Sequence, residues 1–101
     1  MSSRELAFAK LVSVVNSTAA VQVRSGAVLG LGKLGGEQAV DKLIAVLNST
    51  AAVEVRAAAA TGLGIAGGLK ATKKLIDVLN STAAVEVRAA AASALGAAPR
   101  D

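Results

Sequence analysis

Apolar and polar positions along the chain follow the period of an α-helix. Residues 37–47 place Ala39, Leu43 and Leu47 four positions apart, and the charged side chains fall on the other side, as in an amphipathic helix. Residues 51–66 repeat this pattern. Their inward positions are Val55, Ala59, Leu63 and Ala66. The alternation typical of a strand is not sustained, and alanine-rich stretches have low β-propensity, so we predict two helices.

Turn and cap residues separate these predicted helices. We expect Asn48 to close the first helix, and Ser49 or Thr50 to cap the next one by accepting a bond from its free N–H groups. The pair Gly67-Gly68 is expected to end the second helix, where the chain needs positive φ. We expect Gly35-Gly36 to end the second helix of the preceding unit in the same way, and Pro99 follows the last predicted helix.

The segment Asn-Ser-Thr-Ala-Ala-Val occurs at Asn16, Asn48 and Asn80, one copy every 32 residues. Residues 47–64 and 79–96 agree at 16 of 18 positions. A fixed period of this length is typical of a solenoid. We therefore predict an all-α fold, a right-handed α-α superhelix of three helical hairpins. It forms one domain over residues 1–101, with repeats at about 4–35, 36–67 and 68–98.

The amino-acid composition limits both the fold class and the kinds of catalytic or metal site that the chain can form. The chain has 24 alanines and a single aromatic residue among 101, so closely approaching helices fit it better than a sandwich or barrel. The absence of cysteine excludes disulfides, thiolate nucleophiles and Cys-ligated metal sites. The absence of histidine removes the commonest general base and metal ligand. We expect no catalytic residue, no cofactor and no metal.

Hydropathy and charge bear on location and partners. The longest runs without charge are 13 residues (11–23 and 57–69), and a membrane span needs about 20. No signal peptide is visible, so we expect a soluble, cytoplasmic protein without a membrane span. The net charge is +4, but no aromatic side chains stand ready to stack on bases and no arginine run exists. These features do not favour nucleic-acid binding.

Charged positions recur with the repeat. Arg24, Arg56 and Arg88 are equivalent and form a predicted structural ladder, in which each arginine satisfies turn carbonyls or hydroxyls between repeats. An anion track is the alternative. Glu54 and Glu86 also recur, and we interpret them as a solvated rim, because identical repeats lack the asymmetry that paired-carboxylate catalysis needs.

A lysine patch (Lys70, Lys73 and Lys74) opens the first helix of the third repeat. On a helical wheel it lies outward with Asp77, and Lys73 can pair with Asp77 at the i, i+4 spacing. We interpret the patch as a solvated face. A docking patch for an acidic partner is the alternative.

The repeated motif resembles a known family. The residues that carry the resemblance are Val55-Arg56, Ala59-Ala60, Leu63-Gly64 and Gly67, with their counterparts in the other copies. They look like the HEAT-like repeat of the phycobilisome lyase type. The resemblance implies protein-binding scaffolds, bilin lyase subunits or metal hydroxylases, but the His-Glu pairs of the hydroxylases are absent. That family usually carries an acid in the turn. Here serine and threonine stand there, so the polar ladder between repeats is expected to be weaker or rerouted.

We expect a non-catalytic scaffold for protein–protein interaction. A bilin lyase-like or lyase-associated subunit is the alternative, and a nucleic-acid-binding module is a weaker one. A consensus-like or recently duplicated sequence with no cognate ligand also stays open. The expected binding face lies on the second helices, opposite the inward stripe, and is small and mostly apolar. It comprises Val21, Ser25, Val28, Leu29, Val53, Ala57, Ala60, Thr61, Val85, Ala89, Ala92 and Ser93.

The chain is also expected to self-associate. Polar capping repeats normally seal the ends of a solenoid, yet the third repeat nearly copies the second and leaves its outer flank open. The first helix carries Arg4, Glu5 and Lys10 and is expected to be the better protected end. Two-fold pairing through the binding face or the C-terminal end is the commonest closed solution, whereas end-to-end stacking gives open filaments.

Overall fold

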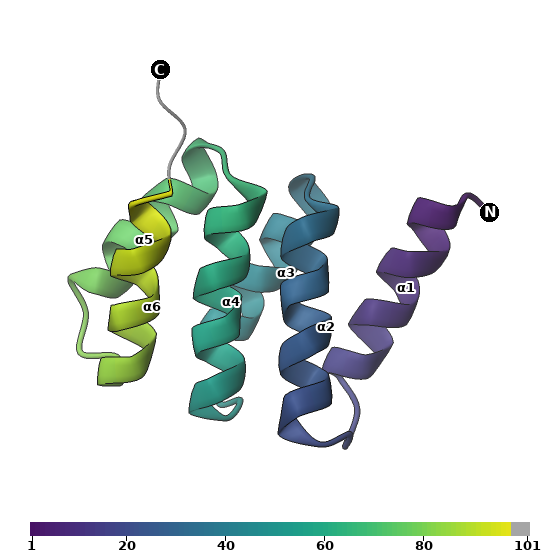
Figure 1. Cartoon of the computed structure of the whole chain (residues 1–101), viewed down its shortest axis with the longest axis horizontal. Coiled ribbons are helices and arrows are strands. Elements are labelled where there is room, and N and C mark those ends of the chain that lie inside the picture. The colour runs from purple at the N-terminus through teal and green to yellow at the C-terminus, as the bar shows by residue number, and fades with distance from the viewer. Residues whose placement is uncertain (98–101) are drawn as a thin grey trace.

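The structure, a computed structural model, describes residues 1–97, and this part of the chain forms six α-helices in tandem. No strand occurs within that range. Pro99 and the end of the third predicted repeat lie outside the described residues. The helices are α1 (Ser3–Val15), α2 (Val21–Leu34), α3 (Glu37–Leu47), α4 (Val53–Ala66), α5 (Leu69–Leu79) and α6 (Val85–Leu95) (Figure 1).

The helices pair into three hairpins that stack into a solenoid. Figure 1 shows α2, α4 and α6 side by side, with α3 behind α2 and α4 and α5 behind α6. Each first helix packs on the second helix of its own hairpin, and the most extensive contacts join α2 to α4 and α4 to α6. The body measures 37 × 32 × 16 Å. The predicted all-α solenoid of three helical hairpins is confirmed.

The core follows the predicted inward stripe. Leu43, Val55, Ala59 and Leu63 are all buried. Small residues let the second helices approach closely, since a Cβ built on Gly32 would lie 2.5 Å from the Cα of Gly62. Only glycine at that position allows the backbones of α2 and α4 to come so near each other.

The Asn-Ser-Thr turns lie along one edge of the molecule (Figure 1). Asn48 closes α3, as predicted. The predicted capping of α4 by Ser49 or Thr50 is wrong, because α4 is preceded by Ala52 and has no side-chain cap. Ser49 instead braces its own turn: its hydroxyl donates to the carbonyl of residue 46 at 2.6 Å and accepts from the N–H of residue 51 at 3.1 Å. Two alanines separate Thr50 from the helix, so the hydroxyls sit too early in the chain to cap it.

The Gly-Gly pairs end the second helices as predicted. Gly67 and Gly68 have φ angles of 72° and 94°, and Gly35 and Gly36 have 69° and 89°. Residues with a Cβ rarely adopt this left-handed region, so glycine permits the abrupt change of direction between repeats.

Candidate functional site

The solvent face of α2, α4 and α6 holds most of the predicted binding residues. Thr61, Val85, Ala89, Ala92 and Ser93 are exposed. The half-buried members of the predicted face are Val21, Ser25, Leu29, Val53 and Ala57. Polar and charged positions share the open face, because Gln22, Glu54, Glu86 and Lys33 are also exposed. The surface is therefore a mixture of small, polar and charged side chains rather than an apolar patch.

Two residues of the predicted face are placed wrongly. Val28 and Ala60 are each 0% exposed and cannot contact a partner. A helical wheel assumes that a helix packs against a single core on one side. In this solenoid, the second helix of each hairpin also packs against the second helix of the adjacent hairpin. Val28 and Ala60 point at the next second helix, so only the strip beyond them stays open.

The repeated arginines brace the turns. The Nε atoms of Arg24, Arg56 and Arg88 donate to the carbonyl oxygens of residues 19, 51 and 83 at 2.9, 2.9 and 2.8 Å. Each bond stays within its own repeat, five residues back along the chain. The predicted bond to turn carbonyls is confirmed, but the predicted link between repeats is not made through these bonds.

Lysine–asparagine bonds join the repeats instead. Lys42 Nζ donates to Asn16 Oδ1 at 2.9 Å, and Lys74 Nζ donates to Asn48 Oδ1 at 2.7 Å. The two bonds occupy equivalent places between the first and second and between the second and third repeats. The polar ladder is thus rerouted from the arginines to a lysine on the next first helix.

The lysine patch is largely engaged in contacts between repeats. Lys70 Nζ lies 2.5 Å from Asp41 Oδ1, and this bond together with the negative charge of Asp41 raises the pKa of Lys70. Lys74 holds Asn48, as described above. Lys73 is exposed, and within residues 1–97 it forms no ion pair with Asp77. The predicted pairing of Lys73 with Asp77 at the i, i+4 spacing is therefore not made, and it is Lys70 and Lys74 that bond to the second repeat.

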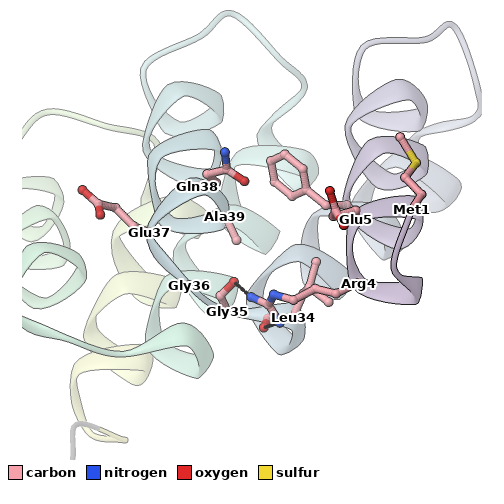
Figure 2. A pocket seen from close by; sticks show the side chains of 10 residues that line it. Met1, Arg4, Glu5, Leu34, Gly35, Gly36, Glu37, Gln38 and Ala39 are labelled. Carbon is pink, nitrogen blue, oxygen red and sulfur yellow. Dashed lines mark hydrogen bonds between the residues drawn. The ribbon is translucent and has the colours of Figure 1, made fainter.

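A groove lies between the start of α1 and the turn from α2 to α3 (Figure 2). Its volume is about 540 Å³, within the range of small-ligand pockets. Met1, Phe8 and Ala39 contribute apolar surface. Arg4 forms part of the wall and donates to the carbonyls of residues 34 and 35 at 2.8 and 2.6 Å.

Sequence reasoning missed this groove. It forms because α1 packs on α2 and makes little contact with α3, and no motif marks such a gap. The remaining lining residues are Glu5, Leu34, Gly35, Gly36, Glu37 and Gln38.

The first helix begins with a capping box. Ser2 Oγ accepts from the N–H of Glu5, and a Glu5 carboxylate oxygen accepts from the N–H of Ser2, both at 3.1 Å. The hydrogen bond from the backbone N–H of Ser2 is the main cause of the lowered pKa of Glu5, and the interaction with the Ser2 side chain lowers this pKa further. At the N-terminal end, α1 has no buried residue and Val23 of α2 is 54% exposed. Charges at the start of α1 do not cover the flank of α2.

Neither a metal-binding cluster nor a membrane-spanning helix occurs within residues 1–97. Across residues 1–97, no three acidic side chains lie close enough together to hold a metal ion. None of the helices in this range combines the length and the apolar character that crossing a bilayer requires.

Tandem helical hairpins, joined by glycine pairs and by polar links from lysines to the preceding repeat, define a helical-repeat solenoid. The chain matches the HEAT repeats family over residues 8–96, and it belongs to that family. Among curated proteins no match was found. HEAT repeats generally mediate protein–protein interaction, so the solvent face of the second helices and the two ends of the solenoid are the surfaces of interest.

Proposed function

We propose that the protein is a non-catalytic scaffold that binds a partner protein through the open face of α2, α4 and α6, and that it also associates with itself. The observation that carries the first part is the repeating strip on this face. The positions of Ala57 and Thr61 recur every 32 residues, as Ser25 and Leu29 in the first repeat and as Ala89 and Ser93 in the third, so an elongated partner would meet an equivalent strip on each repeat. Small side chains on the second and third repeats let a partner backbone or helix approach closely.

Affinity capture from the source cell tests the binding face. The bait is the 101-residue chain, compared with Thr61→Arg combined with Ser93→Arg, two exposed positions on the face. Lys73→Glu is the matched control, because Lys73 is exposed on α5, outside this face. We expect the arginine variant to lose the captured partner and the control to keep it. Loss by the control alone would instead place the partner on the lysine patch and contradict this part of the proposal.

A bilin lyase-like or lyase-associated subunit is the second candidate function. The groove beside Arg4 favours it, because about 540 Å³ with an arginine in the wall suits an apolar pigment that carries carboxylates. Visible absorbance after incubation with a bilin and gel filtration would report the pigment, because unmodified protein side chains do not absorb visible light. Arg4→Ala should weaken such binding, and a colourless protein peak would rule this candidate out.

Nucleic-acid binding is a weaker candidate, supported only by the charge of +4. It predicts a mobility shift with any oligonucleotide that disappears as salt is raised. No shift at low salt would exclude it.

A further inference from the structure

Equivalent positions on the second helices differ in exposure according to whether another repeat covers them. Val55 and Val87 face the preceding repeat and are each 1% exposed, whereas Val23 at the same position in the first repeat is 54% exposed. On the other flank, Ala60 and its first-repeat counterpart are 0% exposed, whereas Ala92 in the third repeat is exposed. The two ends therefore present the two halves of the interface that joins the repeats internally.

The close backbone contacts between neighbouring second helices recur at a fixed spacing along the chain. The same spacing could continue from the last repeat of one copy into the first repeat of another. A Cβ built on Gly32 would lie 2.5 Å from the Cα of Gly62, and one built on Gly64 would lie 2.7 Å from the Cβ of Ala94. The next pair in this series joins Gly96 at the C-terminal end to the position of residue 30 in a following unit. Gly30 of the chain itself is small enough for that place.

The polar link between repeats can be continued in the same way. Lys42 bonds Asn16 and Lys74 bonds Asn48, so the next bond in the series requires a lysine opposite Asn80. The lysine at the equivalent position of the first repeat is Lys10, which is exposed, as is Asn80. A following unit that begins like this chain would supply that lysine.

We propose that a second copy of this chain stacks head to tail on the first, with its α1 and α2 against α5 and α6. The copy would bring Lys10 to Asn80, Gly30 to Gly96, and Val23 and Ala92 into the interface between the copies. This rests on the self-association proposed above and specifies its surfaces. Three repeats of 32 residues shift the copy by 96 positions, so the lysine–asparagine bond and the close backbone pairs have counterparts between copies. The Lys70–Asp41 bond has none, because Leu6 and Lys73 occupy the equivalent positions.

The chemistry favours this pairing over a two-fold one. A two-fold axis through either end would bring two N-terminal ends or two C-terminal ends together. Lys10 and Asn80 lie at opposite ends, so neither would meet its partner across such an interface. A head-to-tail contact is heterologous, so each copy keeps one free end and the assembly grows as an open superhelix. Its average mass should rise continuously with concentration.

Two chains with opposite ends blocked provide the decisive test. Val23→Lys blocks the N-terminal end and Ala92→Lys blocks the C-terminal end, and both residues are exposed, so both variants should keep the helical circular dichroism of the parent. In sedimentation equilibrium at several hundred micromolar, the parent chain should exceed 9.9 kDa without a plateau. Each variant alone should sediment at 9.9 kDa, and their equimolar mixture should approach twice that mass.

Ile65→Lys is the matched control, because Ile65 is 49% exposed and the equivalent position of the first repeat is already Lys33. It should associate as the parent does. A mixture that stays monomeric would overturn head-to-tail stacking, as would a single-end variant that still associates alone. If both variants associate while Thr61→Arg is monomeric, self-association stands but runs through the open face. A parent chain that is monomeric at every concentration would contradict both head-to-tail stacking and self-association, and would leave the proposed binding of a partner protein unaffected.

Discussion

At the scale of single residues, glycine has different physical roles in different parts of the same helix. In α2, Gly32 lies against the backbone of α4, where a side chain has no room. Gly26 lies on the same helix with nothing within 4 Å of a Cβ built on it. The first glycine is required by packing, while the second only adds backbone entropy to the unfolded state.

Alanine substitution should therefore have opposite effects at these two positions. Gly32→Ala should lower the free energy of unfolding by about 1–3 kcal/mol, because the added methyl group forces α2 and α4 apart. Gly26→Ala should raise it by about 0.5–1 kcal/mol, because alanine is the better helix former. Urea denaturation followed by circular dichroism measures both, and equal effects of the two changes would show that α2 and α4 do not pack closely.

At the scale of elements, hydrogen bonds from the same repeat hold the backbone of each Asn-Ser-Thr turn. Ser49 bonds the end of α3 and the following backbone, while Arg56 holds the carbonyl of residue 51. Within residues 1–97 the hydroxyl of Thr50 makes no hydrogen bond. The second helices consequently start without a side-chain cap.

Substitutions in one turn can separate these roles. Ser49→Ala removes a donor and an acceptor and should cost about 1 kcal/mol of unfolding free energy. Thr50→Ala should change it by less than about 0.5 kcal/mol. Thermal unfolding of the two variants gives the comparison, and a larger loss at Thr50 would mean that the threonine, not the serine, holds the turn.

The capping box of α1 predicts a pH effect. The bonds to Ser2 lower the pKa of Glu5 in the folded chain. The stabilisation of the fold by ionised Glu5 is therefore fully present above the ordinary pKa of a glutamate, and it is lost as pH falls through the lowered value. Ser2→Ala removes the hydroxyl but keeps the backbone N–H of residue 2, so it should move the pKa of Glu5 only part of the way back toward its ordinary range. An NMR titration of the Glu5 carboxyl carbon in the parent and the variant measures this, and a parent midpoint no lower than that of an ordinary glutamate would show that the box does not persist in solution.

At the scale of the whole molecule, the stability of each repeat depends on its neighbours, because each hairpin buries its apolar stripe against the adjacent hairpins. Leu63 in the middle repeat is 0% exposed, whereas its counterpart Leu95 in the last repeat is half-buried. The central repeat therefore carries more of the core than the terminal one.

Truncating these two leucines tests this distribution. Leu63→Ala should cost about 2–5 kcal/mol, and Leu95→Ala should cost clearly less, because its side chain loses fewer contacts. Denaturation at a low protein concentration, where association is weak, gives both values. A greater loss at Leu95 would mean that another surface already covers the last repeat in solution.

The sequence by itself determined the repeat, the helices and the inward stripe. A period of 32 residues, apolar positions at helical spacing and paired glycines act locally, so they can be deduced along one chain. The inward positions of Val55, Ala59 and Leu63 and the left-handed Gly67-Gly68 turn follow from these patterns alone.

The tertiary structure decided which outward positions stay open and which partners the polar side chains find. Val28 and Ala60 are buried because second helices lie against each other, a contact that no single-helix wheel contains. Lys74 bonds Asn48 and Lys70 bonds Asp41 across repeats, although sequence proximity favoured a pair within α5. The distance between consecutive repeats sets these contacts, and that distance follows from how closely the backbones pack, not from spacing along the chain.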